Sequence, residues 1–264
     1  MIEFENVSVV LGKSEILKNI NCKISNKCLL LGPNGSGKTT LIRTAVGLVK
    51  PTRGKVLIDG KEVERVVGGV GLVTSNIEEL FHILRISTYD CIRLFCDLLS
   101  ADADLVFEKL ADFGIDTKLL KKRKIWELSS GQRKIVTSVV ALLSGCRHVL
   151  LDEPFEQLDP ARKLKILGLI QEFNANILVS THETWLIDQL KGWNVYFMFE
   201  GKLYGPVSVD IMKNAKIVVG RSDKSVLTFE ISGRPVSLVL HEEGISISQI
   251  MTLDKVYEIA LVAR

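Results

Sequence analysis

The sequence lacks a hydrophobic run of membrane-spanning length. Its 264 residues contain no stretch of about 18 or more apolar residues, so we expect that the chain does not cross a membrane by itself. The first residues, Met1-Ile2-Glu3-Phe4-Glu5, also lack the basic segment and following apolar run of a secretory signal. Both absences predict a cytoplasmic chain.

Neither the cysteines nor the net charge indicates a zinc site, a redox site or a nucleic-acid partner. The five cysteines show neither zinc-ligand spacing nor a paired redox motif, so we expect small buried side chains in a reducing compartment. The 34 Lys and Arg residues exceed the 31 Asp and Glu residues too little to indicate nucleic acid as a partner. A basic run at 121–124 is most simply a solvated face. No nucleic acid partner is expected.

The sequence does contain alternating strand and helix patterns. Short apolar runs predict buried strands at 28–31, 148–151 and 177–180. Helical spacing occurs at 40–48, after the first of these strands, and at 135–143, before the second. It occurs again at 162–173, between the second and the third. This alternation predicts an α/β fold with a largely parallel sheet. Residues 77–127 suit several short helices, which indicates a helical insert between two halves of the core.

The last part of the chain has a different pattern. Two apolar runs flank Glu200-Gly201, which predicts a hairpin, and short strands and a final helix near 253–263 follow. We therefore divide the chain into a domain of residues 1–205, with a helical subdomain at about 77–134, and a small α+β unit of residues 206–264. The latter is called the C-terminal extension below.

A phosphate-binding motif follows the first buried strand. Residues 32–39 satisfy G-x-x-x-x-G-K-[ST] between a strand and a helix. Glycines let successive N–H groups turn inward around an anion, and the helix N-terminus adds positive potential. Lys38 is expected to bind the β- and γ-phosphates and Thr39 to ligate Mg²⁺. The remaining nucleotide-binding candidates surround them in the loop: Asn34, Gly35, Ser36, Gly37 and Thr40.

Two carboxylates end the buried strand at 148–151. Asp152 is assigned to Mg²⁺, and Glu153 to the water that attacks the phosphate. Side chains alternate along a strand, so the two acids need not point the same way. A strand end with solvated acids is the alternative, and the phosphate loop elsewhere in the chain argues against it.

Three further segments resemble motifs of one family. Leu128-Ser129-Ser130-Gly131-Gln132 resembles the L-S-G-G-Q signature of ABC ATPases, with Ser130 in place of the first glycine. Gln157-Leu158-Asp159 looks like the D-loop of that family, and Ser180-Thr181-His182 looks like its switch-histidine segment. With the phosphate loop and the acidic pair, five motifs occur in the family's order within residues 1 to about 205.

The resemblance implies a P-loop NTPase fold of the ABC type that hydrolyses ATP with Mg²⁺. It implies that Glu153 and His182 are catalytic, with His182 sensing the γ-phosphate. In ABC proteins the signature binds the nucleotide of a partner chain, so Ser129, Ser130, Gly131 and Gln132 would contact ATP held by a second subunit, head to tail. The second subunit completes either a homodimer or a heterodimer.

Two positions depart from the family's pattern. Many members have an aromatic residue that stacks on adenine where this chain has Leu11. The family also has a metal-contacting glutamine after a strand resembling Val70-Gly71-Leu72-Val73, where this chain has Thr74-Ser75-Asn76. Ser75 occupies the glutamine's place and Asn76 is the nearest amide. Adenine binding and coupling to the partner are therefore expected to be unusual.

The leading interpretation is a transporter ATPase on the inner face of the cell membrane, working with a separate membrane-spanning subunit. The tail at 250–260 is similar to the S-L-E-D-V-F ending of the drug-exporter subgroup, and it could either stabilise the core or regulate it. A soluble ABC ATPase acting on DNA or ribosomes is the first alternative, although the insert is too short for a coiled coil and only one phosphate loop is present. An ATP-sensing module with weak hydrolysis is the second, and Leu11 and Ser75 keep it open.

Overall fold

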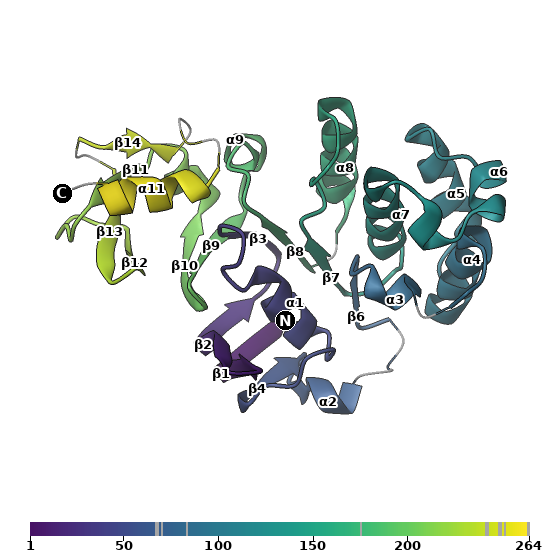
Figure 1. The fold of residues 1–264 in the computed structure, drawn as a ribbon, viewed down its shortest axis with the longest axis horizontal. Coiled ribbons are helices and arrows are strands. Elements are labelled where there is room, and N and C mark those ends of the chain that lie inside the picture. Colours follow the sequence, from purple (N-terminus) through teal and green to yellow (C-terminus); the bar gives the residue numbers. More distant parts are fainter. Residues whose placement is uncertain are drawn as a thin grey trace. The chain divides into compact units, whose positions relative to one another are not determined.

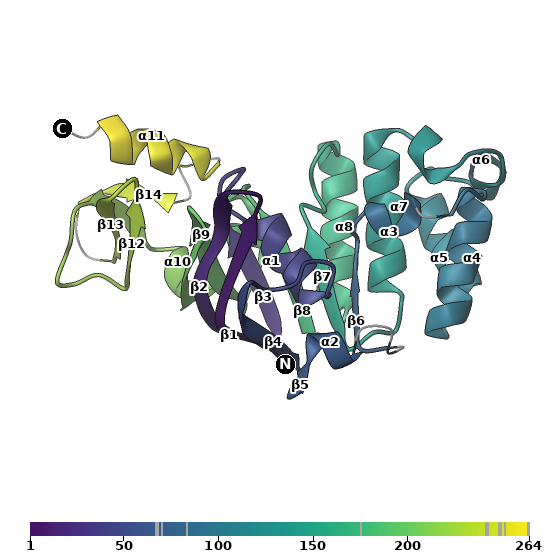
Figure 2. The same cartoon turned by 60° about the horizontal axis from the view of Figure 1, so that its bottom comes forward.

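The structure is a computed structural model (Figures 1 and 2). It describes residues 1–66, 69, 71–82, 84–174, 176–240, 243–247, 250 and 252–262. The chain divides into two compact units: unit 1 comprises Met1–Arg65 and Ser180–Arg264, and unit 2 comprises Val66–Val179. The chain passes from one to the other within α2 (Val63–Val66) and within β8 (Asn176–Thr181).

Unit 1 begins with an antiparallel sheet of order β2-β1-β4-β5. Ile2 pairs with Ile24 on one side and with Ile58 on the other, and all three side chains are buried. Its strands are β1 (Ile2–Leu11), β2 (Ser14–Ile24), β4 (Arg53–Ile58) and β5 (Lys61–Glu62). The pair of strands at 53–62 was not predicted, because exposed polar residues interrupt its apolar pattern.

A second set of strands in unit 1 runs in the order β10-β9-β3, and the last two residues of β8, Ser180 and Thr181, also belong to this unit. β3 (Lys27–Leu31) is parallel to β9 (Asn194–Phe199), and β10 (Lys202–Ser208) returns antiparallel to β9. The predicted hairpin at Glu200-Gly201 is thereby confirmed. Two helices follow these strands, α1 (Lys38–Ala45) after β3 and α9 (Leu186–Gln189) after β8. The buried β3 therefore leads directly into the phosphate loop and α1.

The C-terminal extension, coloured green to yellow in Figures 1 and 2, packs against β9 and β10. The Phe229 ring stacks on Phe199 with centroids 4.7 Å apart, and Phe197 lies 5.7 Å from Phe229. Its own sheet has the order β12-β13-β11-β14. The elements are α10 (Val209–Met212), β11 (Lys216–Val219), β12 (Leu227–Ile231), β13 (Arg234–Val239), β14 (Ile245–Ser246) and α11 (Asp254–Val262). The extension thus shares an apolar core with the strands of unit 1.

Unit 2 places β7 (His148–Asp152) between β8 and β6 (Val73–Ser75), with β6 and β7 parallel. The predicted helical insert is present, and α4, α5 and α6 lie together beside α7 (Figure 1). The helices are α3 (Glu79–His82), α4 (Thr88–Leu99), α5 (Ala103–Asp112), α6 (Thr117–Lys122), α7 (Ser130–Leu142) and α8 (Pro160–Glu172), with a 3₁₀ turn at Ile125–Glu127. Ser87, Asp102 and Asp116 accept backbone N–H bonds at the starts of α4, α5 and α6.

The α/β fold with parallel buried strands agrees with the sequence-based prediction. The strand expected at 70–73 is observed at Val73–Ser75, and Val70 lies outside the described residues, as do Met251 and Ala263 of the predicted C-terminal segment. α7 begins five residues before the predicted helix at 135–143, because polar residues of the signature form its first turn. No helix among the described residues is long and apolar enough to span a bilayer.

The cysteines are free thiols, and four of the five are buried. Burial raises the pKa of the Cys28 and Cys91 thiols to about 11, so both remain protonated at neutral pH. A protonated thiol is neither a good nucleophile nor a good metal ligand. The expectation that these residues are small core side chains is confirmed for the four buried ones.

Candidate functional site

The phosphate loop connects β3 to α1 through two glycines that no other residue could replace without strain. A Cβ atom added at Gly32 would lie 2.5 Å from the Met198 carbonyl oxygen. Gly37 is the N-cap of α1 and has a φ of +111°, a backbone conformation that side chains with a Cβ rarely adopt. The loop therefore passes close against β9 and turns its backbone into the start of α1.

Lys38 lies at the centre of this loop. Its ammonium donates to the carbonyl oxygens of Gly32 at 2.7 Å and Pro33 at 3.0 Å, and the residue is 5% exposed. Ser36 is also buried, and its hydroxyl has no hydrogen-bond partner among the described residues. Asn34 and Gly35 are exposed, and Thr39 and Thr40 are half-buried. A buried ammonium at the start of a helix, next to a glycine-rich loop, is suited to a polyphosphate anion.

The switch-histidine segment adjoins the phosphate loop within unit 1. The N–H of Gly32 donates to the Thr181 carbonyl oxygen at 3.2 Å, and the next residue is His182, which is half-buried. Leu11 ends β1, where it pairs with Ser14 and is 47% exposed. Unit 1 thus brings together the loop and His182, and it presents the Leu11 side chain to solvent.

The acidic pair lies in unit 2, at the end of β7. The side chain of Asn76 bonds both backbone groups of Asp152: its oxygen accepts from the Asp152 N–H at 2.7 Å and its nitrogen donates to the Asp152 carbonyl at 3.2 Å. Lys134 donates to the same carbonyl at 3.2 Å. Glu153 follows with a left-handed φ of +44°, a conformation that is uncommon for a residue with a long side chain.

Ser75 and Asn76 have different environments. Ser75 pairs with Leu150 in the parallel ladder, is 2% exposed, and has a hydroxyl without a hydrogen-bond partner among the described residues. Asn76 is 1% exposed and also donates to the Ser138 hydroxyl at 3.1 Å. The amide that the sequence marked as a possible metal contact is therefore used to hold the main chain of Asp152.

The signature and the D-loop are packed against each other. Ser129 caps α7 and forms a reciprocal pair with Gln132, at 3.3 Å and 3.0 Å. A Cβ atom added at Gly131 would lie 3.0 Å from the Gln157 carbonyl oxygen, so a larger residue there would push the D-loop outward by a few tenths of an ångström. Asp159 caps α8 by accepting from the Arg162 N–H at 3.0 Å. Ser129 and Ser130 remain exposed or half-buried at the start of α7, where N–H groups favour an anion.

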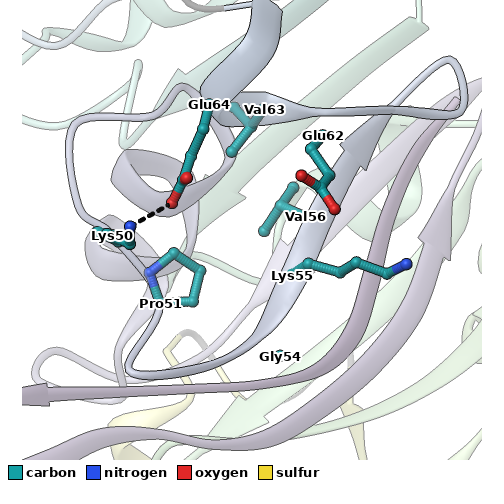
Figure 3. Close-up of a pocket in the computed structure, with 8 residues that line it drawn as sticks. All are labelled: Lys50, Pro51, Gly54, Lys55, Val56, Glu62, Val63 and Glu64. Carbon is teal, nitrogen blue, oxygen red and sulfur yellow. Dashed lines mark ion pairs between the residues drawn. The ribbon is translucent and has the colours of Figure 1, made fainter.

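Two surface pockets contain none of the predicted site residues. One, shown in Figure 3, is a cavity of about 170 Å³ in unit 1 beside the start of β4, and a Lys50–Glu64 ion pair of 3.1 Å crosses it. The other, of about 350 Å³, lies between α5 and α8 in unit 2. Each is lined by two lysines together with two carboxylates, so neither has the one-signed charge that a phosphate group needs.

Comparison with known proteins decides the family. The sequence profile described as ABC transporter matches residues 17–156. The zinc import ATP-binding protein ZnuC of Rickettsia prowazekii is 30% identical over 195 residues, which cover 71% of this chain and 78% of that protein. The chain belongs to the ABC transporter family. As a member, it is an ATP-binding and ATP-hydrolysing subunit that powers transport across a membrane.

Other ABC-family relatives differ in the substrate their names give. The lantibiotic transport ATP-binding protein SrtF of Streptococcus pyogenes is 27% identical over 208 residues, covering 77% of this chain and 89% of that protein. A solved structure provisionally assigned as the cobalt transport ATP-binding protein cbiO-2 is 32% identical, with a TM-score of 0.89, and covers 98% of this chain and 100% of its own. These names span several cargoes and do not single out the drug-exporter subgroup.

The ABC fold itself is also seen in a dimeric ATP-binding cassette bound to ADP and Pi, with a TM-score of 0.66 and 20% identity over 79% of this chain.

Sequence patterns had not revealed Lys134, whose side chain donates to the Asp152 carbonyl oxygen at 3.2 Å. The two residues are distant in sequence, and no local pattern indicates such a bond. The position of this lysine, five residues after Ser129, was the available signal.

Proposed function

We propose that two copies of this chain, or this chain and a similar subunit, bind two ATP molecules head to tail and drive a membrane-spanning partner on the inner face of the cell membrane. Lys38 binds the β- and γ-phosphates, with the N–H groups of residues 34–40 around them. The signature residues, Ser129 to Gln132, contact the ATP held by the other subunit. The buried ammonium of Lys38, surrounded by loop carbonyls, is the observation that carries this proposal.

Hydrolysis in this proposal requires a base and a γ-phosphate contact. Glu153 takes a proton from the attacking water, whose oxygen bonds to the γ-phosphorus as the bond to the bridging oxygen of ADP breaks. His182 contacts the γ-phosphate, and Asp159 lies in the D-loop beside Gly131. The products are ADP and phosphate, and their loss separates the two subunits. The left-handed φ of Glu153 supports a functional role for this turn.

The residues fit Mg²⁺ as the metal of the site. Mg²⁺ prefers hard oxygen ligands, keeps several waters, and is commonly held by one or two protein side chains with the substrate's phosphates. The Thr39 hydroxyl and the Asp152 carboxylate are such donors, and Ser75, with its unpartnered buried hydroxyl, is a third candidate. No cluster of three or more histidine, cysteine or acidic side chains that could hold a metal exists in the described part of the chain. When bound, Mg²⁺ would neutralise phosphate charge.

The first test is metal-dependent hydrolysis together with membrane attachment. We expect the purified chain to release phosphate from ATP with MgCl₂, to stop in excess EDTA, and to recover when MgCl₂ is restored. In native cell fractions the chain should sediment with membranes and be released by an alkaline wash, as a peripheral subunit is. ATP binding without phosphate release would favour the ATP-sensing alternative. A chain found only in the soluble fraction would favour the non-transport alternative.

The exposed Leu11 predicts a gain of adenine affinity on aromatic substitution. Leu11→Tyr should tighten ATP binding about fivefold, because an aromatic pair contributes about 0.5–1.5 kcal/mol beyond area burial. Val10→Tyr is the matched control, since Val10 is its equally exposed neighbour on the other face of β1. Calorimetric titration with ATP measures both. Equal affinities in the two variants would place Leu11 away from the base.

A further inference from the structure

Residues of the C-terminal extension bind the switch-histidine segment directly. The N–H of Leu253 donates to the His182 carbonyl oxygen at 3.1 Å, and Glu183 pairs with Thr252 in an antiparallel bridge. The Thr184 hydroxyl donates to the Ile250 carbonyl oxygen. We call these contacts, made by residues 182–184 with Ile250, Thr252 and Leu253, the clasp. His182 and the two residues after it are therefore each bound to the extension.

Three of the six clasp residues are buried, which shields their hydrogen bonds from water. Thr184 is 4% exposed, and Ile250 and Leu253 are each 1% exposed, so water cannot easily replace the lost partner of a broken bond. On the other side of His182, the Thr181 carbonyl accepts from Gly32, and the Thr181 hydroxyl accepts from the Glu183 N–H at 3.1 Å. The backbone of His182 is thus held by the phosphate loop before it and by the extension after it.

A second contact leads from the extension to the phosphate loop. The Glu200 carboxylate accepts from the Ser232 N–H at 2.9 Å and from its hydroxyl at 3.1 Å. The next residue, Gly201, donates to the Ser36 carbonyl oxygen at 3.0 Å. Gly201 cannot carry a side chain there, because a Cβ atom would lie 2.2 Å from the Ile16 carbonyl oxygen. The extension is therefore bound directly to His182 and is connected to the phosphate loop through Glu200 and Gly201.

The clasp is anchored by the packing of α11. Val256 and Ala260 on this helix are fully buried, and Arg234 of β13 donates to the Ala260 carbonyl at 3.0 Å. The ring of Tyr257 lies 5.9 Å from Phe199, and its hydroxyl bonds Glu200. Burial, followed by the charge of Glu200, raises the pKa of Tyr257 to about 12, so the hydroxyl keeps its proton at neutral pH. The tail at 250–260, which resembles a family ending, thus contributes to this contact through Ile250, Thr252 and Leu253.

We propose that the C-terminal extension sets the position of His182, with Thr184, Ile250 and Leu253 as positioning residues. The inference rests on the proposed role of His182 at the γ-phosphate. Because the clasp holds the backbone of the switch segment and leaves Lys38 in place, loosening it should slow hydrolysis and leave ATP binding nearly unchanged. This assigns the extension a part in turnover beyond that of a stabilising cap.

Thr184→Val tests the proposal by removing the hydroxyl donor with little change of shape. We expect kcat for ATP hydrolysis to fall roughly five- to twentyfold, because a displacement of ~1 Å can cost ~100-fold in rate, and the Kd for ATP to change less than about twofold. Thr184→Ser, which keeps the donor, should recover most of the rate. Thr184→Ala removes the same donor with less bulk and replaces the valine variant if that variant does not fold.

Thr228→Val is the matched control. The Thr228 hydroxyl bonds Ser225 and Ser237, each at 3.0 Å, within the extension and away from the clasp. It should lower thermal stability comparably, because it also removes a hydroxyl donor. It should leave kcat within about twofold of wild type, because it leaves the clasp intact. An equal fall of kcat in both variants would mean that general loosening is responsible, and it would overturn the proposal.

A double-mutant cycle separates this inference from the proposed function. If Thr184 acts through His182, Thr184→Val should have no further effect on kcat in a His182→Ala background. Full activity of His182→Ala would reject the role proposed for His182 itself. Reduced activity of His182→Ala with wild-type kcat in Thr184→Val would leave that role standing and reject the clasp.

Discussion

Replacing Glu153 by glutamine is expected to lower ATP turnover by about 10²- to 10⁴-fold, the range contributed by a positioned general base. Glutamine has nearly the same size but cannot accept the proton of the attacking water. ATP binding by Lys38 does not depend on this carboxylate, so nucleotide affinity should be retained. Because hydrolysis normally reopens the two subunits, the variant should accumulate as an ATP-bound dimer. Phosphate release and size-exclusion chromatography with ATP measure the two effects.

Glu156→Gln is the control for this prediction. Glu156 lies in the same turn, where its N–H donates to the Glu153 carbonyl at 3.2 Å, and it is likewise half-buried. The same change of charge at this position should leave turnover within about twofold of wild type, as surface changes away from a site usually do. Wild-type turnover in Glu153→Gln would remove Glu153 from the role of base, whatever its effect on dimerisation.

Asn76→Ala is expected to lower the free energy of unfolding by about 2–3 kcal/mol and to reduce kcat as well. The change leaves the Asp152 N–H without its partner, and a buried donor left unsatisfied costs about 1–3 kcal/mol. It also removes the bond to the Ser138 hydroxyl. The peptide groups that orient Asp152 and Glu153 become looser, so we expect kcat to fall more than the affinity for ATP does. Urea unfolding and steady-state hydrolysis measure the two quantities.

Thr74→Ala is the matched control, because Thr74 lies in β6, two residues before Asn76, and is half-buried. It should change the unfolding free energy by less than about 1 kcal/mol, because the bonds to the main chain of Asp152 that Asn76 and Lys134 make stay in place. If Asn76→Ala behaved like Thr74→Ala in both measurements, the side chain of Asn76 would not be what holds the end of β7.

Much of the fold could be predicted because its signals are local. The buried strands at 28–31, 148–151 and 177–180 are continuous apolar runs, and a strand covered on both faces requires such a run. The hairpin at Glu200-Gly201 has its turn residues between two apolar segments. The strands at 53–62 were not predicted, because partly exposed strands carry mixed polar and apolar residues without a clear period.

The candidate site also has parts that the sequence predicted and parts that it did not. The motif at residues 32–39 predicted the phosphate loop, because backbone geometry around an anion demands glycine at fixed positions. The structure then gave Gly37 its left-handed φ and Gly32 its close approach to Met198. By contrast, the resemblance placed Asn76 next to a metal-contacting position, whereas its amide bonds the main chain of Asp152. An amide side chain can both donate and accept hydrogen bonds. Its partner depends on which residues of other segments pack against it, and the sequence around the amide does not specify them.

The sequence by itself determined the family and the chemistry, since phosphate binding and hydrolysis need particular side chains at short, fixed spacings. Only the tertiary structure decided how those side chains are supported. The bond from Leu253 to His182 joins residues far apart in the chain, as does the contact of Gly131 with Gln157. Such contacts arise when packed elements bring distant backbone groups together, and single residues such as Thr184 carry no periodic or compositional mark of them. The clasp on His182 therefore became visible only in the folded chain.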